Sequence, residues 1–297
     1  MNDTIPLAQK LRTLGADVTP EMLTGTAAVV APLHANTSRD GVRVTRDHRY
    51  GPAERNRLDI FEPEKGSEAR PVLLFVHGGG FIAGDKTAPN SPFYDNVGLW
   101  AVRNGLIGVT MTYRLAPEHQ WPAGSEDVSS AVKWLRENVA AHGGDLNRIY
   151  VMGQSAGGTH VAGYIAREFG ETGGRAPHEG WKPAGALLIS GLYDTDTMNR
   201  DARFRSYFGN DDAKLENASF LGALAGTTVP LFVVIAELDP HDFQNQFVEL
   251  LEARVRHRQK QARIVQLTQH NHVSTTWCMN SAADTLGPEV KRFISET

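Results

Sequence analysis

Short, continuous apolar runs alternate with longer amphipathic stretches over most of this chain. The apolar runs are predicted to be strands, and they cover residues 72–77, 106–113, 149–153, 184–190, 231–236 and 263–267. Apolar residues recur at helical spacing between them, which predicts helices over residues 93–104, 126–141, 156–169, 243–259 and 284–296. Strands that are apolar throughout are buried on both faces, and intervening helices imply parallel neighbours. The pattern therefore predicts an α/β fold built on a mostly parallel sheet.

The first 62 residues do not follow this alternation. Leu7, Leu11 and Leu14 lie at i, i+4 and i+7, and Thr19-Pro20 is a start signal for a second helix that runs through Val30. Residues 42–62 instead alternate apolar and polar side chains, which predicts strands. Residues 1–40 are therefore expected to form a helical segment that is separate from the domain of residues 41–297.

A second departure is the long polar stretch of residues 192–228, between two predicted strands. It is predicted to be largely helical, and its first half, residues 195–214, carries many charges. Insertions of this length near strand ends are more often lids or binding elements than idle loops. Because the charges suit a solvated surface, a lid that docks on lipid is not expected. The alternative is that these charges line the pocket and bind an ionic substrate.

Composition narrows the class of protein. Hydrophobic residues make up 41% and charged residues 22% of the 297 residues, with a formal net charge of −4, which fits a globular chain and not a nucleic-acid binder. The longest apolar runs are far too short to span a bilayer, and the first residues lack the pattern of a signal peptide. With Cys278 as the single cysteine, we expect a cytoplasmic protein without membrane or nucleic-acid partners.

The strongest chemical signal is Gly153-Gln154-Ser155-Ala156-Gly157, which follows a predicted strand and opens a predicted helix. This is the G-x-S-x-G nucleophile elbow in the setting that it requires. The sharp turn would point the Ser155 hydroxyl out of the sheet edge, with the backbone N–H of Ala156 facing the same spot. The other interpretation, a glycine-rich turn with a passive serine, is less consistent with this context.

A second signal, His77-Gly78-Gly79-Gly80, directly follows an earlier strand. Glycines here let backbone N–H groups point into a cavity, where they can stabilise a developing oxyanion. A phosphate-binding loop is the alternative, but the G-x-x-x-x-G-K-[ST] pattern is missing. The two glycine-rich turns together favour acyl-transfer chemistry.

A nucleophilic serine requires a base and an acid that orients the base, and these follow the serine in this order: acid, then histidine. The acids after the strand of residues 231–236 are Glu237, Asp239 and Asp242, of which Asp239 is favoured because it lies in a turn three residues beyond the strand. His270 and His272 follow the last strand, and His272 is favoured because it precedes a stretch, residues 273–283, that looks helical.

These motifs together resemble the α/β-hydrolase superfamily, and most closely the hormone-sensitive-lipase-like carboxylesterases. Further support comes from Tyr113-Arg114-Leu115-Ala116-Pro117-Glu118 and from Glu126-Asp127. The resemblance covers residues 42–296 and implies an eight-stranded sheet flanked by helices, with residues 1–40 and about 192–228 forming a helical cap. It also implies that Gly79, Gly80 and Ala156 form the oxyanion hole, that no metal or organic cofactor is needed, and that two copies can pair through the last strand.

Two short sequence patterns differ from what is typical of that family. Gln154 stands where the elbow usually has an aspartate, and His270-Asn271-His272-Val273-Ser274 resembles arylformamidase-type relatives. The prediction is therefore a carboxylesterase for small or short-chain acyl esters. Alternatives are an amidase-type hydrolase with the same triad and a non-catalytic ligand-binding member of the fold. Phe81 and Tyr193 are candidates for contact with the substrate.

Overall fold

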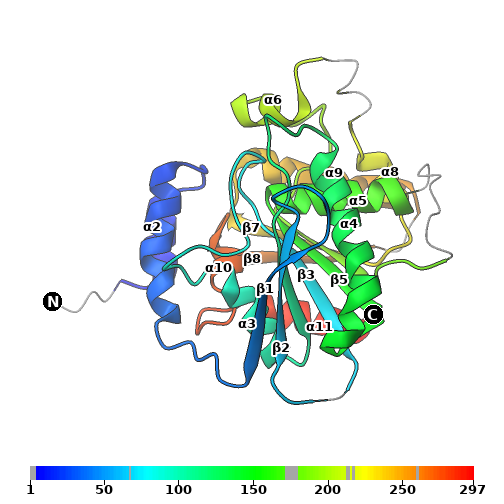
Figure 1. The fold of residues 1–297 in the computed structure, drawn as a ribbon. Helices are drawn as coiled ribbons and strands as arrows, with labels where there is room; N and C mark the ends of the chain where they lie inside the picture. Colours follow the sequence, from blue (N-terminus) through cyan, green and yellow to red (C-terminus); the bar gives the residue numbers. More distant parts are fainter. Residues whose placement is uncertain (1–4, 67, 171–179, 212–214, 216–217, 259–260) are drawn as a thin grey trace.

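The computed structural model describes residues 5–66, 68–170, 180–211, 215, 218–258 and 261–297, which are built around one eight-stranded sheet (Figure 1). The strands are β1 (Val42–Arg49), β2 (Arg57–Pro63), β3 (Arg70–Val76), β4 (Ile107–Met111), β5 (Gly144–Gln154), β6 (Gly185–Ile189), β7 (Leu231–Leu238) and β8 (Arg263–Asn271). Their order is β1-β2-β4-β3-β5-β6-β7-β8, and only β1–β2 and β2–β4 are antiparallel. The predicted mostly parallel sheet is confirmed.

The sheet is buried on both faces, as the apolar runs predict. Along β3, Leu73 and Phe75 belong to one hydrophobic core, and Leu74 and Val76 belong to the other. Successive strand side chains point to opposite faces, so each continuous apolar run serves two cores at once.

Helices cover the two faces. The core on one face includes residues of α4 (Ala123–Asn138), α5 (Ala156–Phe169) and α9 (His241–Arg256), and the core on the other includes residues of α3 (Asp95–Arg103) and α11 (Leu286–Glu296). All five were predicted, with ends that differ by a few residues. Short 3₁₀ helices, Ala31–His34 and Val139–His142, extend two helices of the chain.

The helix expected over residues 273–283 is wrong for most of its length. Only α10 (Ser274–Trp277) is helical, and Asn280 has a positive φ of 67°, which a right-handed helix cannot contain. The Asp284 carboxylate accepts hydrogen bonds from the N–H groups of Asn280 (2.9 Å) and Gly287 (2.7 Å). It thereby holds the turns together and caps the start of α11.

The two segments outside the alternation both contain helices. The N-terminal one forms α1 (Leu7–Leu14) and α2 (Pro20–Val30), and Thr19 Oγ1 accepts a hydrogen bond from the N–H of Met22 at the start of α2. The insertion forms α6 (Ala202–Phe208) and α8 (Leu221–Gly226). Figure 1 shows α2 at one side of the sheet and α6 beyond its upper end.

The charged half of the insertion has a solvated outer side and an apolar inner side. Asp196, Arg205 and Asp211 are exposed, while Phe204 and Tyr207 are buried. Asp212 and Lys214, two of its other charged residues, lie outside the described residues. The segment is therefore packed onto the domain through aromatic residues that its overall polarity conceals.

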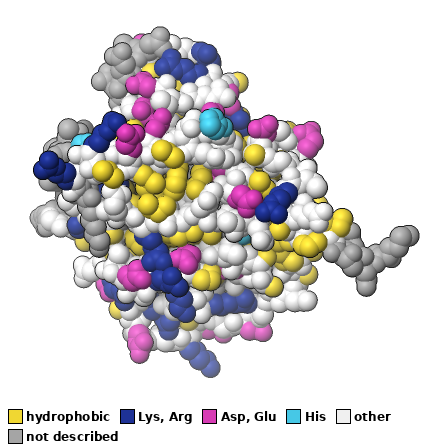
Figure 2. Space-filling model, turned by 180° about the vertical axis from the view of Figure 1, so that it is seen from behind, with side chains coloured by type: hydrophobic (Ala, Val, Ile, Leu, Met, Phe, Trp, Pro, Cys, Tyr) yellow, Lys and Arg dark blue, Asp and Glu magenta, His cyan; other side chains and the backbone are white. Residues whose placement is uncertain are grey.

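None of the helices within the described ranges is long and apolar enough to cross a membrane. Figure 2 shows the face opposite to that of Figure 1, where charges of both signs surround a group of hydrophobic side chains. The large hydrophobic residues that are exposed include Val248 and Val255 of α9 and Ile264 of the edge strand β8. Pairing of two copies through the last strand stays a prediction.

Candidate active site

The turn between β5 and α5 has the predicted sharp geometry. Ser155 lies between them with φ 55° and ψ −125°, a conformation that side chains rarely adopt. A Cβ on Gly153 would overlap the carbonyl of Gly157, and a Cβ on Gly157 would overlap the carbonyl of Val76. Both glycines are therefore required for the close approach of these chain segments.

Three side chains from different parts of the sequence form a hydrogen-bonded chain at this turn. His272 Nε2 lies 2.8 Å from Ser155 Oγ, and His272 Nδ1 lies 2.6 Å from Asp239 Oδ1. Because an ionised carboxylate can only accept, Nδ1 carries the proton and Nε2 is free to accept the proton of the serine hydroxyl. This is the arrangement that a nucleophilic serine requires.

The Asp239 carboxylate is fixed on its other oxygen as well. Oδ2 accepts hydrogen bonds from Ser190 Oγ (2.6 Å) and from the N–H of Ala236 (2.7 Å). Asp239 and His272 are each only 1% exposed. Both side chains are therefore held in one orientation in a largely water-free setting.

The other candidates for acid and base bind elsewhere. His270 is hydrogen-bonded through Nδ1 to Ser274 Oγ (3.0 Å) and through Nε2 to Thr285 Oγ1 (2.8 Å). Glu237 accepts from the N–H of Gln269 (2.6 Å) and from Arg12 (3.0 Å), and these contacts lower its pKa. Asp242 lines the cavity described below, without a contact to His272 among the described hydrogen bonds.

The glycine-rich loop after β3 lies beside the same serine. Gly79 has φ 134° and Gly80 has φ 59°, and a Cβ on Gly79 would overlap the carbonyl of Ala83. Within the described residues, the N–H groups of Gly79 and Gly80 have no backbone acceptor. Ala156 is the first residue of α5, where an N–H has no partner within the helix. All three residues line the cavity that contains Ser155, as an oxyanion hole requires.

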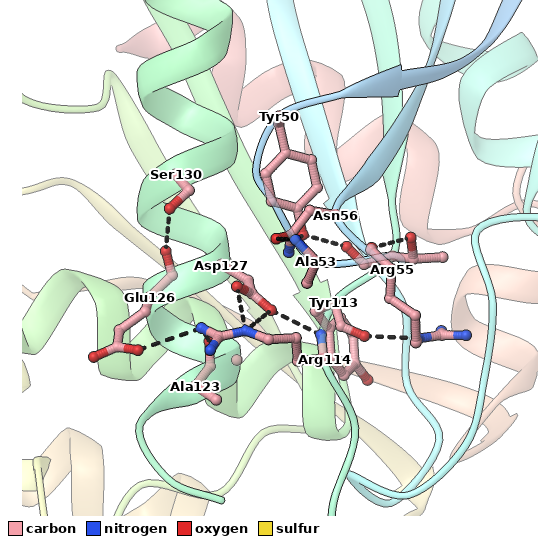
Figure 3. A network of polar contacts seen from close by, with 12 residues as sticks. Tyr50, Ala53, Arg55, Asn56, Tyr113, Arg114, Ala123, Glu126, Asp127 and Ser130 are labelled. Atoms are coloured by element: carbon pink, nitrogen blue, oxygen red, sulfur yellow. Dashed lines mark hydrogen bonds and ion pairs between the residues drawn. The ribbon is translucent and has the colours of Figure 1, made fainter. Parts of the chain in front are cut away.

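The segment after β4 supports this loop through hydrogen bonds. Tyr113 donates from its hydroxyl to the carbonyl of His77 (2.9 Å). Figure 3 shows how the neighbouring Arg114 is fixed: its N–H and its guanidinium bind Asp127, with Arg114 Nε 2.9 Å from Oδ1, and the guanidinium also reaches Glu126. Arg55 in turn donates to the carbonyl of Tyr113 (2.8 Å). The motif of residues 113–118 thus anchors the loop that carries Gly79 and Gly80.

Two buried histidines lie beneath the loop. His77 stacks on Tyr113 with ring centroids 4.4 Å apart, and His160 of α5 lies edge-on to the same ring, also at 4.4 Å. Burial lowers the pKa of His77 to about 4 and that of His160 to about 3. Both side chains are therefore neutral near pH 7 and act as packed, uncharged supports.

Ser155 opens into a cavity of about 950 Å³. The apolar residues of its lining include Leu23 and Ala27 of α2 together with Phe93 and Trp277, whose rings stack 4.4 Å apart. The insertion and the start of α9 contribute polar residues, Asn199, Asp201, Arg203, His241 and Asp242, beside the apolar Phe204 and Phe243. The lining thus combines apolar and polar residues from distant parts of the sequence.

The two candidates for substrate contact differ. Phe81 lines the cavity and stacks on Tyr207 of α6, with centroids 4.7 Å apart. Tyr193 does not line it: the side chain is 1% exposed and packs in the core, and its N–H donates to Gln246 Oε1 (2.6 Å). Leu192, one residue earlier, lines the cavity instead. β6 ends at Ile189, so Tyr193 lies in the irregular segment beyond it, where no periodicity could have predicted its direction.

The charged stretch of the insertion contributes to the cavity lining, as the alternative interpretation of its charges expects, although the interpretation favoured from the sequence is a solvated surface. Asp201 and Arg203 line the cavity, and Arg203 Nε donates to Asp201 Oδ2 (2.9 Å). The Arg203 stem lies so close to Gly80 that a Cβ there would be 2.9 Å from Arg203 Cδ. Nothing local in a charged helical stretch indicates such a contact. Among the described residues, no group of three or more His, Cys, Asp or Glu side chains could hold a metal ion.

Comparisons with known proteins concern the family and the fold of the chain. A family model described as the alpha/beta hydrolase fold matches residues 73–276. Esterase LipI of Mycobacterium tuberculosis is 43% identical over 104 residues, which are 35% of this chain and 31% of that protein. Carboxylesterase NlhH of the same organism is 33% identical over 175 residues, which are 58% and 49% of the two chains. The matched segments thus span about a third and about half of these relatives.

Two solved structures resemble the whole chain in fold. Esterase B from Lactobacillus rhamnosis has a TM-score of 0.76 at 17% identity, covering 98% of this chain and 96% of that one. A hyperthermophilic esterase from the archaeon Pyrobaculum calidifontis has a TM-score of 0.71 at 23% identity, covering 98% and 96%. At these identities the likeness concerns the fold.

Proposed function

Because the chain belongs to the alpha/beta hydrolase fold family, we propose that it is a serine hydrolase that cleaves carboxylic esters. The observation that carries this proposal is the hydrogen-bonded chain Ser155–His272–Asp239 at the floor of a large cavity. The names of the matched relatives, an esterase and a carboxylesterase, support the same class of reaction.

In the first half of the reaction, Ser155 Oγ attacks the acyl carbonyl while His272 Nε2 takes its proton. Asp239 stabilises the imidazolium that results and keeps the ring in the correct tautomer. The carbonyl oxygen becomes negatively charged and is met by the N–H groups of Gly79, Gly80 and Ala156. When the tetrahedral intermediate collapses, His272 returns the proton to the leaving alcohol, and the acyl group remains on Ser155.

In the second half, water replaces the alcohol. His272 accepts a proton from the water as it attacks the acyl-enzyme, and the same three N–H groups bind the second oxyanion. Collapse of this intermediate expels Ser155 Oγ, which takes the proton back from His272, and the free acid leaves. In this scheme, residues of the chain carry out every proton transfer and every oxyanion contact, and the water supplies the second nucleophile.

We propose small or short-chain acyl esters as substrates. The charged residues of the cavity lining, Asp201, Arg203 and Asp242, do not suit a face that docks on lipid. A volume of about 950 Å³ is near the upper end for small-molecule sites, so a larger alcohol can accompany a short acyl group. The amidase alternative receives no added support, because the residues behind it bond within their own turn. The His270 side chain binds Ser274 Oγ, which also accepts from the N–H of Asn271, and Asn271 Oδ1 accepts from the N–H of Ser274.

The test is hydrolysis of p-nitrophenyl esters, from acetyl to dodecanoyl, by the wild type and by Ser155→Ala. We expect turnover of the short esters and a loss of about 10⁶ in kcat in the variant, with an unchanged melting temperature. An N-formyl anilide at equal concentration is the competing substrate. Preference for the formamide would replace esterase by amidase, and near-normal turnover by the folded variant would overturn the proposal.

A further inference from the structure

The side chain of Gln154 makes a contact that the mechanism above does not use. Gln154 is the last residue of β5, directly before Ser155, and it is 1% exposed. Its amide Nε2 donates a hydrogen bond of 2.9 Å to the main-chain carbonyl of His272. A buried side chain next to the nucleophile therefore binds the backbone of the base.

The main chain of His272 has little other support from the sheet. β8 ends at Asn271, and the pairing of β7 with β8 becomes irregular before its last pair, Leu238 with Asn271. Among the described residues, the His272 carbonyl accepts one further hydrogen bond, a long one of 3.4 Å from Thr275 Oγ1. The imidazole is thus carried by a residue that lies just beyond the regular strand.

The other end of the contact is rigid. Gln154 pairs with Ile189 of β6, and the N–H of Ser155 donates to the carbonyl of Ile189 (2.9 Å). The amide oxygen of Gln154 also lies against the glycine-rich loop after β3, since a Cβ on Gly78 would come within 2.5 Å of Oε1. One side chain therefore touches the strand of the nucleophile, the loop of the base and the loop of the oxyanion donors.

The residue before the base is held separately. Asn271 donates through Nδ2 to Thr26 Oγ1 of α2 (2.7 Å), and its Oδ1 accepts from the N–H of Ser274 (3.1 Å). These bonds fix Asn271, whereas the bond from Gln154 acts on His272 itself.

We propose that Gln154 is a positioning residue that ties the main chain of His272 to the nucleophile elbow and so keeps His272 Nε2 in reach of Ser155 Oγ. The proposal rests on the proposed function, since it concerns the same triad. An amide suits this place because its N–H₂ donates to a carbonyl, whereas a carboxylate would set an acceptor against an acceptor. A small shift of the base is enough to matter, because misplacement of a reacting group by about 1 Å can cost ~10²-fold in rate.

The test replaces Gln154 by Met, which has a similar shape and no donor, and measures p-nitrophenyl acetate hydrolysis beside the wild type. We expect kcat to fall by about 10- to 100-fold with KM within about threefold. The rate of covalent inactivation by a sulfonyl fluoride should fall in parallel, because it also depends on proton transfer from Ser155 to His272. Thr275→Val is the matched control: it removes the longer bond to the same carbonyl and should lower kcat by less than about threefold.

Gln154→Asn serves as a second variant if the Met variant does not fold, since its shorter amide cannot reach the carbonyl; melting temperatures of both are measured. If Gln154→Met folds and keeps kcat within twofold of the wild type, while Ser155→Ala is inactive, the positioning role alone is overturned. Equal losses in Gln154→Met and Thr275→Val would overturn it too. Activity retained in Ser155→Ala would overturn the proposed function, and this inference with it.

Discussion

Two regions of the site are built in opposite ways: the floor, which is the hydrogen-bonded chain of Ser155, His272 and Asp239, and the walls, which are the parts of α2 and of the insertion that line the cavity. At the floor, Ser155, Asp239 and His272 are joined by hydrogen bonds of 2.6 and 2.8 Å, and the acid and base are 1% exposed. At the wall from the insertion, Asp201 and Arg203 pair with each other at 2.8 Å but keep 34% and 46% of their side-chain surface exposed. A buried, multiply bonded group has one position, whereas an exposed ion pair adds little stability and moves easily.

The difference follows from where each region lies in the chain. The floor lies at the carboxyl ends of β3, β5, β7 and β8, which are parallel strands of one sheet, so the sheet itself sets the spacing of the groups. The walls come from α2 and from the insertion before β7, which pack on the sheet from outside. The floor is therefore expected to set the chemistry, and the walls are expected to set which substrates reach it.

The strongest test of the floor is Asp239→Asn. The amide has one acceptor oxygen where the carboxylate has two. If that oxygen keeps the bonds from Ser190 and Ala236, an N–H₂ group faces His272 Nδ1, which favours the wrong imidazole tautomer. We expect kcat to fall by about 10⁴. Esterase assays at saturating substrate measure this. Glu237→Gln is the matched control: Glu237 binds Arg12 and Gln269, and kcat should stay within about threefold. A comparable loss in both variants would contradict the assignment of the acid.

A second prediction concerns the buried histidines beneath the floor. At pH values well above 6.5, His77 and His160 are neutral in both the folded and the unfolded chain. Their titration then does not change the free energy of unfolding. As pH falls below 6.5, the unfolded chain binds protons that the folded protein excludes, because burial lowers the pKa of His77 to about 4 and that of His160 to about 3. The free energy of unfolding should fall by roughly 3 kcal/mol through His77 alone by about pH 4.

Denaturant unfolding at several pH values between about 7 and 4 measures this loss. Acidic side chains whose pKa is lowered in the folded state, such as Asp95, add to it below their unfolded pKa values. His160→Phe isolates the histidine contribution, since it keeps an aromatic ring in the cluster and removes the titrating group. The variant should lose less stability on acidification than the wild type, and equal losses would show that His160 does not resist protonation.

The smallest effect is expected at the wall from α2. Ala27→Phe adds a ring to the side of α2 that lines the cavity, near Phe93, and should narrow the space without touching the triad. We expect kcat/KM for long acyl esters to fall by about 10-fold relative to the acetate, since cavity contacts change discrimination by about 1–3 kcal/mol. Ala28→Phe, on the exposed side of the same helix, is the control and should leave the ester profile unchanged. A uniform loss over all esters would show that this wall is coupled to the floor.

Much of the floor is predictable because its signals are local. The elbow requires glycines at fixed positions around Ser155, since any Cβ at Gly153 or Gly157 meets backbone, and such a steric requirement is visible in five residues. The alternation of apolar strands and helices is visible for the same reason, because burial on both faces leaves no place for polar residues in the strands. The choice of Asp239 needs only its position after a strand. The choice of His272 over His270 depends on the helix expected after it, of which only Ser274–Trp277 is helical.

What the walls contain was decided by tertiary packing. Whether Leu192 or Tyr193 lines the cavity depends on how an irregular segment turns beyond β6, and the charged stretch around Arg203 contacts Gly80 only because α6 is docked through aromatic residues. The turns after α10 depend on the Asp284 carboxylate, which no helical period reveals.

The sequence by itself determined the class of fold, the nucleophile turn and the candidate acid and base, because each follows from spacing along the chain. Only the tertiary structure decided that Gln154 holds the main chain of His272, 118 residues away, and that α2 and the insertion enclose the same cavity. Contacts between distant segments depend on the packing of whole elements, and no local pattern of side chains encodes them.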